Sequence, residues 1–290
     1  LADSYVYPEI AKQMTQAIRQ HLEHGDYKAI ATGPELAKAL TDDLLAISHD
    51  HHLRVEWLPK APPADQAEPT DEDKARMKAQ LDKMNCGFVK SEKLAGNIGY
   101  IKFNMFGPAD ICGPKATEAF AAIEGVDAVI FDLRDNGGGD PHMVAYVASY
   151  LFAKRTHIND IYERKANKTE QYWTKPDVPG TKLTTQPAYV LTSARTFSGA
   201  EEFCYDLQNT KRATIIGEVT GGGAHPTDGK RLDDHFMIGV PFARAINPVT
   251  KTDWEGKGIQ PDVKVPADQA LDKAKELAAA KLAKRRKPGT

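Results

Sequence analysis

The sequence predicts an α/β (α+β) protein in which a small helical domain precedes a mixed core of strands and helices. Two observations predict this class. In the first 56 residues, apolar side chains recur about every four positions, as they do along one face of a helix. From residue 87 onward, short apolar runs alternate with a helical segment, which is typical of a largely parallel sheet covered by helices. A Pro- and acid-rich stretch separates the two patterns, so we place the helical domain and linker at residues 1–70 and the core at residues 71–290.

Two amphipathic helices account for the first part of the chain. The stretch YPEIAKQMTQAIRQHLEHG has an apolar face and ends at Gly25, a residue type that commonly closes helices. The stretch GPELAKALTDDLLAI begins with a proline in its first turn and also has one apolar face. The linker LPKAPPADQAEPTDEDKA follows, and we expect proteases to cut first between Pro59 and Asp73. A short polar helix is predicted at residues 71–84.

The core is predicted from apolar runs bounded by turn residues. The expected strands are NIGYIKF, DAVIFDL, AYVLTS and ATIIGEV, with further β-structure in HFMIGVPFARAI. GPKATEAFAAIEG is predicted as a helix between the first two strands, and ADQALDKAKELAAAKLAKRRK as a helix at the C-terminal end. The closing KRRK indicates either a solvated helix end or contact with an anionic partner.

Composition restricts the class of protein. The 290 residues are 41% hydrophobic and 27% charged, as in ordinary soluble globular domains. A formal net charge of -2 gives no general attraction to nucleic acid or to membranes. No apolar run approaches the roughly 20 residues that span a bilayer, so we expect no stable membrane insertion.

The three cysteines, Cys86, Cys112 and Cys204, lie far apart in the sequence. They are too few for a disulfide scaffold and lack the spacing of metal ligands, which favours buried thiols. One disulfide-bonded pair remains the alternative.

Ser198 lies in the stretch TFSGAEEF, at the point where a predicted strand gives way to a helix. One interpretation is a helix cap, because Ser198 and Glu201 form the Ser-x-x-Glu pattern of a capping box. The other is a catalytic nucleophile, although the G-x-S-x-G pattern of a nucleophile elbow is absent. The octapeptide by itself leaves both interpretations open.

A glycine turn, DLRDNGGGD, ends another predicted strand. Glycines supply the positive φ that a tight turn needs, and the Walker and G-x-G-x-x-G patterns of phosphate loops are absent. In a serine enzyme, such a turn lets backbone N–H groups bind the developing oxyanion. Reactive groups collect at the carboxyl ends of parallel strands, so we expect this turn and Ser198 to be neighbours.

Three stretches in this order, DLRDNGGG, TFSGAEE and EGKGIQPDVKV, resemble the C-terminal-processing (tail-specific) serine peptidases. The opening helices and SHDHHLRVEW resemble, more narrowly, the bacterial relatives of interphotoreceptor retinoid-binding protein within that family. The resemblance implies a crotonase/ClpP-like core, Ser198 as the nucleophile, and the backbone N–H groups of Gly138 and Gly199 as the oxyanion hole. Most members carry a PDZ domain before the core, but only about 40 residues separate Trp57 from Ile98, so none is expected here.

The resemblance also bears on the base that activates Ser198. Most members place a lysine 25 residues after the serine, a position that is Gly223 in this chain. A second branch, typified by the tricorn core protease, resembles a Ser–His–Glu arrangement instead. Carried across, that arrangement implies His52 as the base and Glu255 as the residue that orients it.

Other histidines leave this assignment open. His225, in the loop where the lysine would lie, is the alternative base. His49, His51 and His52 could instead be a surface cluster or an adventitious metal site, in which His-x-His spacing places two imidazoles on one face, although no third ligand is identifiable.

The sequence therefore predicts a serine-type peptidase that hydrolyses peptide bonds through an acyl-enzyme on Ser198. The alternative is a non-catalytic retinoid- or lipid-binding protein on the same fold, as the narrower resemblance implies. We expect no cofactor, no resident metal ion and no nucleic-acid partner, with a peptide or protein as the substrate. The resemblance implies a periplasmic or secreted protein, and because the chain starts at Leu1 rather than methionine, a leader is expected to have been removed.

Overall fold

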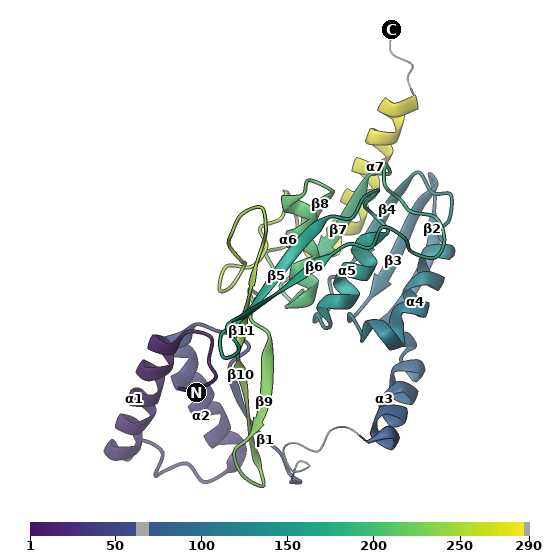
Figure 1. Ribbon diagram of the computed structural model, residues 1–290. Coiled ribbons are helices and arrows are strands. Elements are labelled where there is room, and N and C mark those ends of the chain that lie inside the picture. The colour runs from purple at the N-terminus through teal and green to yellow at the C-terminus, as the bar shows by residue number, and fades with distance from the viewer. Residues whose placement is uncertain (62–69, 287–290) are drawn as a thin grey trace.

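The computed structural model describes residues 1–61 and 70–286, which form two lobes (Figure 1). The smaller lobe holds the N-terminal helices and a three-stranded sheet. The larger lobe is built on a six-stranded sheet covered by helices on both faces, with a second three-stranded sheet beside it. Within the expected linker, residues 62–69 lie outside the described residues. None of the described helices is both long and apolar enough to cross a membrane.

The smaller lobe combines helices with strands from a distant part of the chain. Its helices are α1 (Pro8–His24) and α2 (Gly33–Ser48), and its strands are β1 (Arg54–Trp57), β10 (Phe236–Pro241) and β9 (Thr227–Arg231). The strands pair antiparallel in the order β1-β10-β9. Ile238 and Val240 pack with Met14, Leu44 and Leu53 in one apolar cluster. The expectation of helices up to residue 56 was wrong for β1, because this strand is fixed by pairing with residues far away in the sequence.

The central sheet confirms the predicted, largely parallel core. Its strand order is β12 (Val263–Lys264), β8 (Ala213–Gly217), β7 (Ala188–Thr192), β4 (Ala128–Asp132), β3 (Ile98–Phe103) and β2 (Phe88–Leu94). All neighbours are parallel except β2 and β3. The four central strands are the predicted apolar runs, and β4 and β7 are buried along their whole length, as strands covered on both faces should be.

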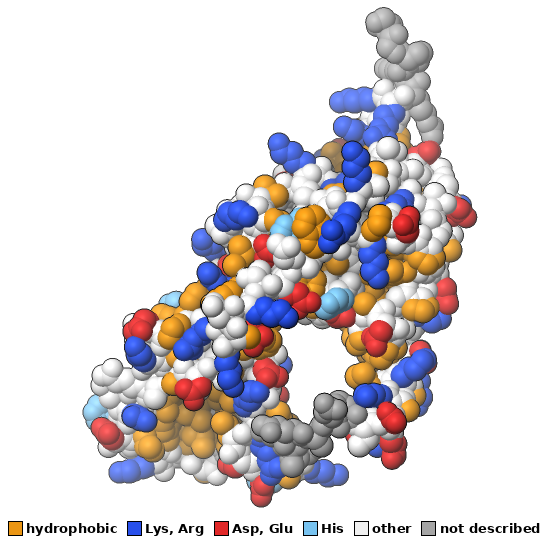
Figure 2. All heavy atoms as spheres, viewed as in Figure 1, with side chains coloured by type: hydrophobic (Ala, Val, Ile, Leu, Met, Phe, Trp, Pro, Cys, Tyr) orange, Lys and Arg blue, Asp and Glu red, His pale blue; other side chains and the backbone are white. Residues whose placement is uncertain are grey.

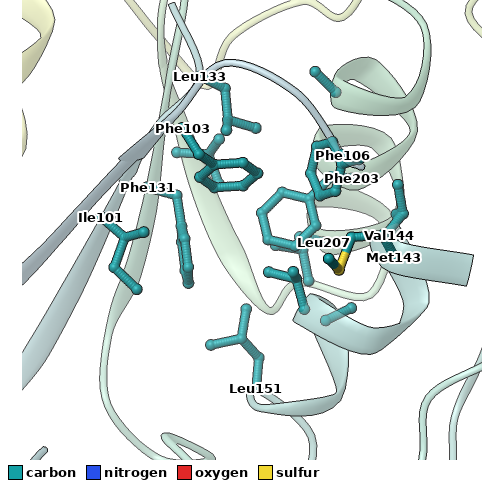
Figure 3. Close-up of a cluster of buried hydrophobic side chains, with 14 of the residues drawn as sticks. Ile101, Phe103, Phe106, Phe131, Leu133, Met143, Val144, Leu151, Phe203 and Leu207 are labelled. Carbon is teal, nitrogen blue, oxygen red and sulfur yellow. The ribbon is translucent and has the colours of Figure 1, made fainter. Parts of the chain in front are cut away.

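Helices cover this sheet on both faces. One face carries α4 (Ala109–Ala121), α5 (Pro141–Ser149) and α6 (Gly199–Asn209). Figure 3 shows the aromatic centre of this layer, where Phe103 stacks edge-on to Phe106 at 4.9 Å and Phe131 meets Phe203 at 5.4 Å. The other face carries α7 (Ala270–Arg286), whose small residues lie close to the strands. Packing of α6 on this core fixes the position of the residue just before it, Ser198.

The remaining elements flank the core. β11 (Ala243–Ile246), β5 (His157–Glu163) and β6 (Lys168–Trp173) form an antiparallel sheet in which β6 is an edge strand. The predicted polar helix is α3 (Asp71–Lys83), followed by the 3-10 turn η1 (Asn85–Gly87); a second such turn, η2 (Ala267–Gln269), precedes α7. The described residues between β1 and β3 form only α3, η1 and β2, so they contain no PDZ domain.

Cys86 and Cys112 form a disulfide that joins η1 to α4. The expectation of buried thiols was therefore wrong for this pair, because the spacing of 26 residues gives no hint that η1 folds back onto α4. Cys204 is a buried free cysteine, as expected.

Candidate active site

Ser198 joins the end of strand β7 to helix α6 in a strained conformation. Its φ and ψ are 53° and -123°, whereas a residue that only caps a helix takes extended, negative-φ values. A non-glycine residue at positive φ is uncommon and costs about 1–3 kcal/mol when the surroundings impose it. The Glu201 carboxylate accepts the Ser198 backbone N–H at 2.8 Å. Ser198 therefore stands at a helix start with its backbone held in a geometry that capping does not require.

Glu201 has a second function that the capping-box pattern does not reveal. Its fully buried carboxylate accepts the backbone N–H groups of Gly222 at 2.7 Å and Gly223 at 2.9 Å, and the hydroxyl of Thr220. Burial raises the pKa of Glu201, and these hydrogen bonds oppose that rise. One carboxylate thus fixes the serine turn and the glycine loop at residues 221–223 relative to each other.

The glycine loop makes room for a histidine. A Cβ atom at Gly223 would lie 2.5 Å from Cε1 of His52 and 2.3 Å from Cζ of Phe197. The rings of His52 and Phe197 lie 4.6 Å apart. Gly223 occupies the position that is a lysine in most of the peptidases this chain resembles. The imidazole of His52 lies in the space that a side chain at this position would fill.

His52 reaches this point from the smaller lobe. It lines two adjoining cavities, of about 360 and 440 Å³, and Ser198 lines both. Burial lowers the pKa of His52 to about 4. Its Nδ1 atom is buried and has no hydrogen-bond partner among the described residues. His52 is therefore neutral near pH 7 and able to accept a proton, whereas His49 and His51 are exposed.

Asp50 is a residue of this site that the sequence reasoning missed. Its fully buried carboxylate accepts the backbone N–H of His52 at 3.1 Å, the hydroxyl of Tyr5 at 3.1 Å, and Nδ1 of His225 at 2.6 Å. Asp50 thereby ties the histidine of the smaller lobe to the loop that follows Gly223. The only available signal was a carboxylate inside the histidine cluster of SHDHHL.

His225 is held differently from His52. It is 2% exposed and also lines the smaller of the two cavities. Desolvation lowers its pKa, but the hydrogen bond that His225 donates to Asp50 and the charge of Glu255 outweigh this and raise it overall. Nδ1 of His225 is thus paired with carboxylates, whereas its Nε2, like Nδ1 of His52, is buried without a hydrogen-bond partner among the described residues.

Glu255 lies next to both histidines. Its Oε2 atom accepts the backbone N–H of Ala224 at 2.5 Å and lies 3.5 Å from Nδ1 of His225. Its Oε1 atom is buried without a partner in the part of the chain that the structure describes. Burial raises the pKa of Glu255 to about 7. One potential ligand atom from each of Asp50, His52 and Glu255 lies within 4.8 Å of the others, so the same three side chains could also accept a cation.

The glycine turn lies against Ser198, as expected from the strand order. A Cβ atom at Gly138 would lie 2.7 Å from Cβ of Ser198 and 2.6 Å from the backbone nitrogen of Gly199. The Gly138 N–H, however, donates to Oδ1 of Asn136 at 2.8 Å. Across the described residues, the N–H groups of Gly139 and Gly199 take part in no hydrogen bond. Both glycines line the cavity that contains Ser198.

A buried acid also lines the Ser198 cavity. Glu202, on the first turn of α6, is 4% exposed, and Asp206 one turn later is fully buried. Burial is the main cause that raises the pKa of both carboxyl groups. Nδ2 of Asn247 donates to Asp206 at 3.2 Å. The wall of the cavity therefore contains one carboxyl group, that of Glu202, whose pKa burial raises to about 7.

Comparisons with known proteins decide the family. The model of peptidase family S41 matches residues 97–265, which is more than half of the chain, and the model described as the N-terminal domain of this family in eukaryotic IRBP matches residues 1–90. The chain belongs to peptidase family S41. This confirms the resemblance to C-terminal-processing serine peptidases that the three motifs carried.

Among curated relatives of this S41 member, the carboxyl-terminal-processing peptidase 2 of Arabidopsis thaliana is 28% identical over 191 residues, or 62% of this chain and 34% of that protein. The carboxyl-terminal-processing protease of Picosynechococcus is 28% identical over 182 residues, or 61% of this chain and 41% of that protein. The chain thus matches less than half the length of these relatives.

Solved structures confirm the fold. A lipoprotein from Streptococcus agalactiae superposes with a TM-score of 0.60 at 14% identity, covering 92% of this chain and 88% of that one. The photosystem II D1 C-terminal processing protease superposes with a TM-score of 0.51 at 22% identity, covering 66% of this chain and 52% of that one.

Proposed function

We propose that this chain is a serine-type peptidase that cleaves peptide bonds through an acyl-enzyme on Ser198. The observation that carries the proposal is a strained serine sharing a cavity with a partly buried, neutral histidine. Backbone strain at a single polar residue is typical of catalytic centres. A carrier of retinoids or lipids would need neither the strain nor a proton acceptor beside the serine.

In the proposed reaction, a ring nitrogen of His52 takes the Ser198 hydroxyl proton while Oγ attacks the scissile carbonyl carbon. The imidazolium then gives this proton to the leaving amine as the C–N bond breaks, and water hydrolyses the ester by the same sequence in reverse. Glu255 stabilises the imidazolium once its own carboxyl group is ionised. Asp50 acts as a positioning residue, because it holds the backbone of His52.

The oxyanion is assigned to the N–H groups of Gly139 and Gly199. The earlier expectation used Gly138, but that N–H already donates to Asn136. Gly139 and Gly199 are close, since a Cβ atom at Gly199 would lie 3.0 Å from the Gly139 nitrogen. Each such donor contributes about 2.7–4 kcal/mol to transition-state stabilisation in comparable enzymes.

We further propose that the substrates are peptides or proteins outside the reducing cytoplasm. The Cys86–Cys112 disulfide supports this location, because such bonds persist mainly in oxidising compartments.

A fluorophosphonate probe tests the proposal without a known substrate. The adduct should map to Ser198, and Ser198→Ala should lose the adduct while keeping its melting temperature. His52→Ala should slow labelling by about a hundredfold or more, the lower range for general-base catalysis, and His225→Ala should slow it less. Labelling confined to other serines of a folded sample would disprove the assignment of Ser198. Unchanged rates in both histidine variants would disprove the histidine mechanism.

A further inference from the structure

Three side chains at the candidate active site form a set of potential metal ligands. One potential ligand atom from each of Asp50, His52 and Glu255 lies within 4.8 Å of the other two. Asp50 and His52 lie between α2 and β1, whereas Glu255 lies on the loop between β11 and β12. Asp50 is fully buried, and the other two are partly buried. The fold thus brings one imidazole and two carboxylates from distant segments of the chain to one point.

Two of these side chains have an atom that lacks a hydrogen-bond partner. Nδ1 of His52 and Oε1 of Glu255 are each buried, and neither forms a hydrogen bond within the described residues. A buried polar atom in this state costs about 1–3 kcal/mol. A metal ion can satisfy both kinds of atom, because an imidazole nitrogen and a carboxylate oxygen each offer a lone pair to a cation. Both side chains are therefore suited to ligate a metal ion.

Asp50 can act as a third ligand without losing its own hydrogen bonds. Its Oδ1 atom accepts the backbone N–H of His52 at 3.1 Å. Its Oδ2 atom accepts the hydroxyl of Tyr5 at 3.1 Å and Nδ1 of His225 at 2.6 Å. A carboxylate offers about four lone-pair sites, so one site on Oδ1 stays available. The three hydrogen bonds hold this carboxylate in place, and a cation would therefore meet a preorganised ligand.

The two carboxylates of this set are not neutralised by a lysine or an arginine. Within the described residues, Asp50 and Glu255 form ion pairs only with His225, at 2.6 and 3.5 Å. The neighbouring charge of Asp253 adds to the negative potential and contributes to the raised pKa of Glu255. A divalent cation would supply the positive charge that these carboxylates lack.

The surface as a whole gives cations no general attraction to this protein. The formal net charge is only -2. On the face shown in Figure 2, Asp and Glu side chains are interspersed with Lys and Arg side chains over both lobes. Specific binding of a metal ion therefore depends on local ligands and not on the overall field.

The ligand types indicate which metal fits. Mg²⁺ and Ca²⁺ take oxygen ligands, whereas Zn²⁺ binds both imidazole nitrogen and carboxylate oxygen, at about 2.0–2.2 Å. The ligand atoms around a tetrahedral zinc ion are therefore about 3.4 Å apart. Ligand atoms that start up to 4.8 Å apart must approach by about 1.4 Å at most. The long side chain of Glu255, which lies on a loop, can supply this movement.

A metal ion on Nδ1 of His52 would stop this residue from acting as the base. If Nδ1 is the nitrogen that accepts the Ser198 proton, the metal occupies its lone pair. If Nε2 accepts the proton, a neutral imidazole with a metal on Nδ1 carries its own proton on Nε2 and has no lone pair to offer there. In both cases the hydroxyl of Ser198 keeps its proton and stays a weak nucleophile.

We propose that Asp50, His52 and Glu255 form a Zn²⁺ site that reversibly inhibits the enzyme. The ion acts as a removable regulator of the proton acceptor and not as a cofactor of the reaction. Zinc binding itself does not depend on the proposed function, whereas the inhibition rests on it. This ligand set differs from the cluster of His49, His51 and His52, for which the sequence showed no third ligand.

Metal binding is measured on Ser198→Ala protein after treatment with a chelator. The probe is Co²⁺, whose visible absorption reports the bound ion, and Zn²⁺ should displace it. In the same background, His52→Ala and Glu255→Gln should each bind Co²⁺ at least about tenfold more weakly, since even outer-shell partners are worth roughly 10–100-fold in metal affinity. The double variant His49→Ala/His51→Ala removes two exposed histidines and is the matched control, which should keep the parent affinity.

The variants separate this site from the exposed histidines. Unchanged Co²⁺ affinity in both His52→Ala and Glu255→Gln would overturn the site. Loss of binding in His49→Ala/His51→Ala, with binding kept in Glu255→Gln, would assign the ion to the exposed cluster and also overturn the proposal. Glu255→Gln keeps the size of the side chain, so it tests the ligand even where His52→Ala fails to fold.

Fluorophosphonate labelling of wild-type protein tests the inhibition. Saturating Zn²⁺ should slow labelling of Ser198 by about a hundredfold, the loss expected when a general base is removed. A chelator should restore the rate, and excess Mg²⁺ should leave it unchanged. Zinc binding with an unchanged labelling rate would overturn the inhibition. Protein that binds Zn²⁺ at these ligands but does not label at Ser198 in its metal-free form refutes the peptidase and not the metal site.

Discussion

Gly223→Ala tests whether the histidine fits beside Ser198 only because position 223 has no side chain. An alanine Cβ would lie 2.5 Å from Cε1 of His52 and 2.3 Å from Cζ of Phe197, where ordinary contact begins near 3.4 Å. Each ring must therefore move by roughly 1 Å, unless the loop retreats. The loop is held on both sides, because Glu201 accepts the Gly223 N–H at 2.9 Å and Trp254 donates to its carbonyl at 2.7 Å.

The expected effect follows from that displacement. Misplacing a catalytic group by about 1 Å can cost roughly a hundredfold in rate. We expect the second-order rate of fluorophosphonate labelling at Ser198 to fall by about this factor in Gly223→Ala, with a smaller loss of thermal stability. Gly229→Ala is the matched control, since its added Cβ meets only the flexible end of Met237 at 3.2 Å.

A double-mutant cycle checks the cause. In a His52→Ala background, Gly223→Ala should cost little further labelling rate, because the displaced imidazole is already absent. If Gly223→Ala labels at the wild-type rate, or costs the same factor with and without His52, the reasoning about this space is refuted.

Four further predictions follow from burial, charge and strain. The rate of Ser198 labelling should rise with pH, with an apparent pKa near 7 set by Glu255, since His52 with a pKa of about 4 is already neutral at that pH. If the same rise with pH persists in Glu255→Gln, Glu255 is excluded as its source. The raised pKa of Glu202 means that the folded state holds a proton more tightly than the unfolded state, so its contribution to stability is present at low pH and is lost as pH rises through the folded-state pKa. Glu202→Gln should therefore gain melting temperature relative to wild type more at pH 8 than at pH 5, and an equal difference at both pH values would contradict this. Replacing Cys86 and Cys112 by alanine should cost about 3.5 kcal/mol of unfolding free energy on a chain-entropy estimate for a loop of this length, and reductant should then lower the wild-type denaturation midpoint but leave the variant unchanged. Ser198→Gly should be more stable than Ser198→Ala by about 1 kcal/mol, because glycine adopts positive φ without strain, and equal midpoints in urea would argue against strain at this position.

The sequence predicted the parts of the fold that depend on local pattern. The buried strands β3, β4, β7 and β8 are continuous apolar runs, and α1 and α2 have single apolar faces, so periodicity identifies them. Ser198 was also identifiable, because its turn combines a capping box with family motifs in a fixed order. The strain that distinguishes a nucleophile from a cap is a backbone property, and no residue type records it.

Features that depend on distant pairing were not predictable. Asp50 belongs to the site only because Tyr5 and His225, which lie in distant segments of the chain, form hydrogen bonds with it. The Cys86–Cys112 disulfide and the free edge of β6 likewise depend on how elements approach one another. A single sequence carries no signal for such approaches beyond the residue types themselves.

The position of His52 relative to Ser198 depends on one continuous segment, residues 221–241. Its first part is the glycine loop that Glu201 fixes to the serine turn. Its last part, β10, pairs with β1 in a register that places Gly239 opposite Arg54, two residues after His52. A Cβ atom at Gly239 would lie 3.2 Å from the His52 carbonyl oxygen, so β10 approaches the histidine backbone closely. Residues 221–241 therefore contain both the glycine that leaves space for the imidazole and the strand that positions the backbone of His52. A shift of register between β1 and β10 would move the base without changing any catalytic residue.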